Sequence, residues 1–201
     1  MSWSLGEVQA LGIKAARGAG LSWGLAEEAG FAVRWLQGHS LPGAAALAGY
    51  LTWLGEQRED STAVCPLSTG TTICDSAAQR SRELPFEVRR LAFPLLALPF
   101  AAEAMGKHDP LLVQWDDAVF QIDGRRLARS GDESGLLQQL STCCLSRETA
   151  ASVMLCPAAT RVPQSASQTI HRLEKFAART YAPASERSRL TGAGAGTDDQ
   201  D

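Results

Sequence analysis

The sequence predicts an α+β fold in which N-terminal helices and a C-terminal helix pack on a largely antiparallel sheet. Three observations lead to this prediction. Apolar residues recur at helical spacing through the first sixty residues and again over about residues 164–180. Between these regions, segments 111–115 and 118–122 alternate apolar and polar side chains, as the two strands of a hairpin do. Helices followed by strands and a last helix are typical of the α+β class.

Three helices are expected in the first sixty residues. Ser4 and Glu7 have the spacing of a capping box, in which each side chain accepts a hydrogen bond from the other residue's backbone N–H. The first helix therefore begins after Ser4, and it ends at the glycines of residues 18–20. The second helix is expected over about residues 22–38, and the third after the Leu-Pro-Gly turn at 41–43.

The middle of the chain is expected to form strands. Residues 62–75 are rich in Thr, Ile and Val, which predicts two short strands around a loop. Residues 91–102 are apolar but contain two prolines, which favours a buried strand with a bulge or an edge over a helix. The dipeptides at 116–117 and 123–124 indicate hairpin turns, and residues 152–156 are a further strand candidate.

Length and charge limit the classes of protein to which the chain can belong. Its 201 residues fit one domain, which we expect over residues 1–182, followed by a Gly/Ala-rich tail over residues 183–201. The net charge of −3 argues against a general binder of nucleic acid or of anionic membranes.

The cysteines and the apolar runs predict a cytoplasmic protein. The five cysteines are odd in number and contain no Cys-x-x-Cys pair, which indicates reduced thiols. The first residues lack the basic region and apolar stretch of a secretion signal. The longest apolar run, residues 91–102, is too short to span a bilayer.

Two Arg- and Gly-rich segments, at residues 17–30 and 179–196, are the strongest candidates for a binding site. Their glycines permit close backbone approach, and they are Gly18, Gly20, Gly24, Gly192, Gly194 and Gly196. The candidate ligand- or partner-binding residues are Arg17, Trp23, Glu27, Glu28 and Arg34, together with Tyr181, Ser185, Glu186, Ser188 and Arg189. Arginine suits bidentate recognition of a carboxylate or phosphate.

We expect the tail to fold back onto the junction of the first two helices. Arg17 and Arg189 would then face Glu27, Glu28 or Glu186 and leave donors for an anionic ligand or partner. The alternative is a tail without fixed structure, which its small residues favour and which is preferred after residue 196. For the glutamates, the alternative is that they complement the N-terminus of their helix.

Other motifs carry weaker hypotheses. Residues 20–24 match the Gly-x-Ser-x-Gly pattern of serine hydrolases, with His171 as a partner, but a helix is expected before them and Ser22 fits a helix cap better. Residues 68–72 suit either an anion cradle or a hairpin loop. The three histidines, His39, His108 and His171, show no ligand spacing, so no metal site is predicted.

The end segments also resemble a known family. Lys14-Ala-Ala-Arg-Gly-Ala-Gly20, Trp23-Gly-Leu-Ala-Glu-Glu-Ala-Gly30 with Arg34-Trp-Leu36, and the closing Arg179-Thr-Tyr-x-Pro-x-Ser-Glu-x-Ser-Arg189 are similar to an uncharacterised bacterial protein family, domain of unknown function 3726. The resemblance implies that both end segments are features of the family and that the tail is part of the domain. It implies no activity, catalytic residue or cofactor.

Two classes of function are therefore expected. The first is a cytoplasmic accessory or partner-binding protein of bacterial metabolism. The second is a small-molecule enzyme or sensor that binds a carboxylate or phosphate through Arg17 and Arg189 beside Glu27 and Glu28. A serine hydrolase that uses Ser22 is a third and less favoured hypothesis. The residues assign neither a cofactor nor an oligomeric state.

Overall fold

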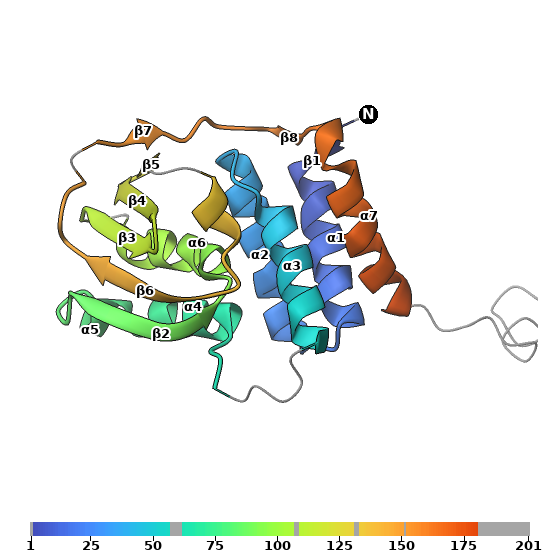
Figure 1. The fold of residues 1–201 in the computed structure, drawn as a ribbon, viewed down its shortest axis with the longest axis horizontal. Coiled ribbons are helices and arrows are strands. Elements are labelled where there is room, and N and C mark those ends of the chain that lie inside the picture. Colours follow the sequence, from blue (N-terminus) through green and yellow to red (C-terminus); the bar gives the residue numbers. More distant parts are fainter. Residues whose placement is uncertain (1, 57–61, 107–108, 131–132, 151, 181–201) are drawn as a thin grey trace, which may run out of the picture.

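The computed structural model describes residues 2–56, 62–106, 109–130, 133–150 and 152–180, and they form an α+β fold, as predicted (Figure 1). The α-helices are α1 (Leu5–Gly18), α2 (Trp23–Gly38), α3 (Gly43–Glu56), α4 (Pro66–Asp75), α5 (Ala77–Arg80), α6 (Leu98–Ala101) and α7 (Ser167–Ala177). Single helical turns are η1 (Pro94–Leu96), η2 (Ala102–Gly106), η3 (Ser134–Leu137), η4 (Gln164–Ala166) and η5 (Ala178–Thr180). The strands are β1 (Trp3–Ser4), β2 (Phe86–Ala92), β3 (Leu111–Trp115), β4 (Ala118–Asp123), β5 (Arg126–Ser130), β6 (Leu140–Ser146), β7 (Met154–Leu155) and β8 (Arg161–Val162).

Local sequence signals set the ends of the first two helices. The Ser4 Oγ accepts a hydrogen bond from the Glu7 N–H at 3.2 Å, and the Glu7 Oε2 accepts one from the Ser4 N–H at 2.7 Å. This capping box was predicted and is confirmed. Ser22 caps α2, since its Oγ accepts a hydrogen bond from the Leu25 N–H at 3.4 Å. The cap that was preferred for Ser22 is therefore confirmed as well.

The helices α1, α2, α3 and α7 form a bundle beside the sheet (Figure 1). The short strands β1 and β8 pair with each other, so that α1 and α7 start at the same end of the bundle and run side by side. The last turns of these two helices touch. A Cβ on Gly18 would overlap the carbonyl oxygen of Phe176, so glycine is required at this crossing.

The larger sheet is antiparallel, with strand order β2-β6-β3-β4-β5-β7. Both predicted hairpins are present: Trp115 pairs with Ala118 around the first turn, and Asp123 pairs with Arg126 around the second. The expected strand near residues 152–156 is β7, at one edge of the sheet.

Residues 62–75 do not form the two strands that were predicted. From Pro66 they form α4, which begins with a proline in its first turn. Its buried face consists of Leu67, Gly70 and Ile73, at helical spacing. The helix accommodates its β-branched threonines because the Thr71 and Thr72 hydroxyls donate hydrogen bonds to the carbonyl of Ser68, one turn earlier.

The buried strand predicted for residues 91–102 is also wrong, apart from its first two residues. Strand β2 ends at Ala92, and Phe93 has a positive φ of 42°. Pro94 and Pro99 then lie in the first turns of η1 and α6. A backbone N–H at such a position has no acceptor within the helix, so a proline, which has no N–H, costs no hydrogen bond there. The prolines therefore start helical turns instead of interrupting a strand.

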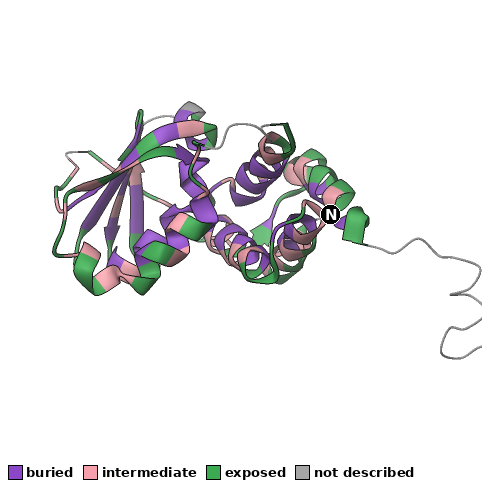
Figure 2. Cartoon of the chain, turned by 90° about the horizontal axis from the view of Figure 1, so that it is seen from below, coloured by how far each residue is buried: buried purple, intermediate pink, exposed green. Residues whose placement is uncertain are grey.

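This segment connects the two halves of the molecule. Helix α6 contacts α2 and α4, η1 contacts α3 and β6, and η2 contacts β3 and β4. Side chains of α4 and α6 meet those of β2, β3 and β6, so these helices cover one face of the sheet. Buried residues line the strands, this segment and the inner faces of the helices (Figure 2). No helix in the described part of the chain is long and apolar enough to cross a membrane.

Candidate functional site

The structure places Arg17 against Trp23 and not against the acidic residues of α2. The Arg17 guanidinium lies 4.7 Å from the centroid of the Trp23 ring, and its Nη1 donates to the carbonyl of Leu21. The Trp23 side chain is 66% exposed. Arg17 and Trp23 therefore form a cation–π pair at the start of α2.

Glu27 and Glu28 have no ion-pair partner among the described residues. Partial burial raises the pKa of Glu28, and the charges of Glu27 and Asp75 raise it further. Arg34, seven residues after Glu27, donates instead to the Gln9 Oε1 at 3.0 Å. The predicted meeting of these glutamates with Arg17 is thus absent from the described part of the chain.

Of the three N-terminal glycines, only Gly18 has another backbone against it, and the partner is α7. Gly20 has a φ of +96°, and neither it nor Gly24 has any described atom within 4 Å of the position of a Cβ. The C-terminal candidates lie outside the described residues; they are Tyr181, Ser185, Glu186, Ser188, Arg189, Gly192, Gly194 and Gly196.

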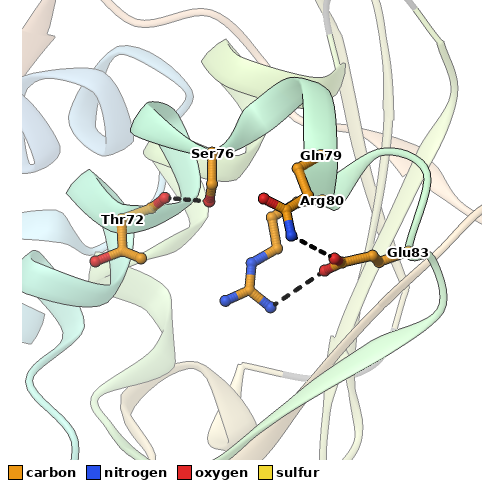
Figure 3. A network of polar contacts seen from close by, with 5 residues as sticks. All are labelled: Thr72, Ser76, Gln79, Arg80 and Glu83. Carbon is orange, nitrogen blue, oxygen red and sulfur yellow. Dashed lines mark hydrogen bonds and ion pairs between the residues drawn. The ribbon is translucent and has the colours of Figure 1, made fainter.

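The hydrolase and anion-cradle hypotheses lose their structural context. Ser22 follows helix α1 and caps α2, whereas a nucleophile elbow requires a preceding strand. The His171 Nδ1 lies 3.4 Å from the Glu174 Oε2 on its own helix. Residues 68–72 lie within α4, where backbone amides serve the helix (the Thr72 and Ser76 end of α4 is drawn in Figure 3). Neither an elbow nor an amide cradle is therefore formed.

A pocket of about 470 Å³ lies where the bundle meets the sheet, and we call it the Trp35 pocket. It is bounded by the last turns of α2, by η2 and by the turn between β4 and β5. Its lining residues are Trp35, His39, Ala102, Glu103, Ile122, Gly124, Arg125, Arg126 and Leu127.

One wall of this pocket is aromatic. Trp35 and His39 are four residues apart at the end of α2, so their side chains lie on one face of the helix. Their ring centroids are 4.0 Å apart. The His39 Nδ1 lies 2.8 Å from the Trp35 carbonyl oxygen, which can only accept, so Nδ1 carries a proton and donates. In the neutral tautomer with this proton on Nδ1, the lone pair is on Nε2, which can accept a hydrogen bond.

Glu103 supplies the acidic group of the pocket. It lies in η2, which is a π-helical turn, a rare geometry that appears frequently at functional sites. The Trp35 Nε1 donates to the Glu103 Oε1 at 3.0 Å, which joins the bundle to this turn and holds both side chains in place.

The β4–β5 hairpin brings two arginines to the pocket. Gly124 has the positive φ of 59° that such a tight turn needs, and its N–H donates to the Gly106 carbonyl at 3.0 Å. A Cβ on Gly106 would overlap Ile122, so the turn and η2 approach closely only because this residue is glycine. Arg125 lies in the turn itself and Arg126 is the first residue of β5; both are exposed, and neither forms an ion pair with any described residue.

The arrangement suits recognition of an anion. Two arginines and one carboxylate line the pocket, so its arginines outnumber its acidic groups. No group of three or more His, Cys, Asp or Glu side chains that could hold a metal ion occurs in the described part of the chain.

The Trp35 pocket was not predicted from the sequence. His39 showed no ligand spacing to the other histidines, and the arginines after the Asp-Gly dipeptide at 123–124 were not among the candidate residues. The one available signal was that turn itself, since a predicted hairpin turn followed by two arginines presents both guanidinium groups at one end of a sheet. Nothing in the sequence showed that this end faces Trp35.

Residues 3–82 match the model of a family described as a protein of unknown function (DUF3726). The match confirms the predicted resemblance over this part of the chain, which includes Trp35 and His39 and ends before Glu103, Arg125 and the C-terminal segment. No curated protein and no solved structure matches the chain.

Proposed function

We propose that this protein binds a small anionic molecule, a carboxylate or a phosphate, in the Trp35 pocket. The observation that carries the proposal is a pair of arginines that have no ion-pair partner in the described structure and that line, together with an aromatic wall, a pocket of about 470 Å³. This is the small-molecule class expected from the sequence, but at a different place from the predicted Arg17 site.

Each group in the pocket has a role in this proposal. Arg125 and Arg126 bind the anionic group, because guanidinium forks match the two oxygens of a carboxylate or phosphate. The ring wall of Trp35 and His39 contacts the apolar body of the ligand. The His39 Nε2 and the Glu103 carboxylate accept hydrogen bonds from its hydroxyl or amine groups.

Calorimetric titration with inorganic phosphate, pyrophosphate and succinate tests the proposal. At least one of these probes is expected to bind, and the double variant Arg125→Gln/Arg126→Gln is expected to bind it at least roughly tenfold more weakly, because each charge-assisted hydrogen bond contributes about 1.5–3 kcal/mol. The control is Arg89→Gln, which removes an 83% exposed arginine on β2, outside the pocket. Equal affinity in the double variant, or no binding of any probe, contradicts the proposal.

The exposed edge of the sheet favours a second candidate function, the binding of a protein partner. In β7, Met154 is 74% exposed and Leu155 is 67% exposed. An edge strand with exposed apolar side chains offers unpaired backbone groups to a strand of another protein. This agrees with the accessory role expected from the sequence. The free cysteines among the described residues support a cytoplasmic location in a bacterium for either role.

The second candidate is tested with Met154→Lys/Leu155→Lys. The affinity of any protein captured from host cytosol is expected to fall strongly in this variant, while the free energy of unfolding changes by no more than about 0.5 kcal/mol, as for other exposed positions. If the variant binds every captured protein with undiminished affinity, the β7 edge is not the surface that binds a partner.

A further inference from the structure

The start of α2 presents a largely exposed surface in the described structure. We call it the Trp23 surface, formed by Gly20, Trp23, Gly24, Glu27 and Glu28. The Trp23 ring is 66% exposed, with the Arg17 guanidinium lying over it. At Gly20 and Gly24, the described structure leaves space at the position of a Cβ. An apolar ring beside bare backbone is a surface onto which another segment of chain can pack closely.

The same surface has an unbalanced negative charge. Glu27 lies one turn after Trp23 on the same face of α2, and Glu28 is its neighbour. Neither carboxylate forms an ion pair with a described residue, and Asp75 of α4 adds a third negative charge nearby. The raised pKa of Glu28 shows that its charge is unfavourable as the described residues stand. The surface therefore favours a cationic occupant.

The described chain ends close to this surface. The last turns of α7 and η5 pack against α1, with the Phe176 carbonyl at Gly18 and the Arg179 guanidinium 4.6 Å from the centroid of the Phe176 ring. The next residues therefore start beside the last turn of α1, five residues before Trp23. Nine residues span up to roughly 30 Å when extended, which exceeds the distance from that turn to Glu27, about one helical turn into α2.

We propose that residues 181–189 of this same chain dock on the Trp23 surface, with Arg187 and Arg189 against Glu27 and Glu28 and with Tyr181 against the bare backbone of Gly20. In an extended segment, residues two apart point to the same side, so the two arginines reach the two glutamates together. Tyr181 adds a ring that packs on exposed backbone while its hydroxyl stays in water. The proposal is independent of the Trp35 pocket.

Charge reversal in the full chain, followed by hydrogen exchange, tests this docking. In Arg187→Glu/Arg189→Glu, exchange of the amides of residues 20–28 is expected to rise roughly fivefold, as expected from the loss of one or two partly exposed ion pairs. Exchange in β3 and β4 is expected to stay unchanged. The matched control is Arg82→Glu/Arg89→Glu, which reverses two arginines outside this surface and is expected to leave residues 20–28 unchanged.

A compensating variant completes the experiment. Adding Glu27→Arg/Glu28→Arg to the first variant restores opposite charges and is expected to return the exchange of residues 20–28 to within about twofold of the original chain. The docking is overturned if the first variant leaves this exchange unchanged, or if the four-residue variant stays as fast as the first. It is also overturned if residues 20–28 are protected only when a cytosolic protein is added.

Discussion

Gly18 and Gly24 lie six residues apart, but alanine is expected to have opposite effects at the two positions. At Gly18, a Cβ would overlap the Phe176 carbonyl oxygen, which is backbone and moves only if α7 moves. At Gly24, inside α2, a Cβ meets no described atom, so alanine there chiefly removes the entropic cost of helical glycine.

We therefore expect Gly18→Ala to lower the free energy of unfolding by roughly 1–3 kcal/mol, the usual cost of overpacking. Gly24→Ala is expected to raise it by about 0.5–1 kcal/mol. Urea unfolding curves of the two variants beside the original chain measure both effects. An unchanged midpoint for Gly18→Ala would show that α7 does not pack on the end of α1.

The capping box of α1 gives a prediction about pH. The backbone and side-chain hydrogen bonds with Ser4 hold the pKa of Glu7 below the ordinary value of a glutamate carboxyl. A lowered pKa in the folded state means that the ionised form stabilises the fold above the unfolded pKa, and that this contribution is lost as pH falls through the folded pKa. Glu7→Gln is therefore expected to be less stable than the original chain at pH 6, with the difference vanishing as the pH falls below about 4.

The pKa of Glu28 is shifted in the opposite direction, so a Glu28 variant serves as the comparison for the Glu7 variant. Its pKa is raised, chiefly by burial, so its ionised form destabilises the fold as pH rises through the folded pKa. In the Arg187→Glu/Arg189→Glu background, which removes the proposed cationic partners, Glu28→Gln is accordingly expected to gain stability at pH 7 and to match its parent chain at low pH. Free energies of unfolding between pH 3 and pH 7, from urea titrations, measure both variants. If the free energies of unfolding of Glu7→Gln and the original chain differ by the same amount at every pH, the capping-box prediction is contradicted.

At the scale of elements, the close packing of α4 on α6 depends on one missing side chain. A Cβ on Gly70 would overlap the ring of Phe100, which is buried in α6. Gly70 lies between Leu67 and Ile73 on the buried face of α4, so the ring fills the space that a larger residue would take.

Gly70→Ala is expected to destabilise the protein by roughly 1–3 kcal/mol, despite the higher helix propensity of alanine. Phe100→Leu alone is also expected to destabilise it, because it leaves space in the core. Combined, the two substitutions are expected to cost less than the sum of the separate losses, by about 0.5–3 kcal/mol, because the smaller side chain makes room for the new methyl group. Additive losses, measured by chemical denaturation, would contradict this contact.

The same elements explain where prediction from sequence failed. The periodicity of α4 was hidden, because Gly70 occupies a buried position without being counted as apolar. The prolines at 94 and 99 suit either an edge strand or a first helical turn, and only tertiary packing decides between them. By contrast, the capping box of Ser4 and the hairpin turns are local signals, and they were predicted correctly.

At the scale of the whole molecule, the candidate site is assembled from segments far apart in the sequence. Trp35 and His39 belong to the bundle, Glu103 to the connecting segment, and Arg125 to the sheet. Each segment could be assigned a local structure from its own residues, but their meeting depends on how the two halves pack together. The Trp35 pocket was therefore beyond prediction from one sequence, and the family match does not reach the last two of its segments.

This dependence leads to a prediction about cooperativity. Leu95, Leu96 and Leu98 lie where the bundle meets the sheet, and each is at most 1% exposed. Burying one leucine side chain contributes roughly 1.5–3 kcal/mol, so separating the halves would cost about 5–9 kcal/mol from these three alone. That is comparable with the entire stability of a typical domain, about 5–15 kcal/mol. Neither half is therefore expected to stay folded once the other has unfolded.

Unfolding by urea is accordingly expected to follow one transition, as predicted for a single domain. Far-UV circular dichroism reports chiefly on the helices of the bundle, whereas the fluorescence of Trp115 reports on the sheet, where its ring is buried against Phe120. A variant in which the other tryptophans are replaced by phenylalanine isolates the fluorescence of Trp115. The fluorescence curve of this variant is compared with the dichroism curve of the same variant. Both signals should give the same midpoint and slope, because the three leucines couple the halves. If Trp115 becomes exposed at a urea concentration where the helical signal is intact, the sheet unfolds separately and the interface is weaker than its burial implies.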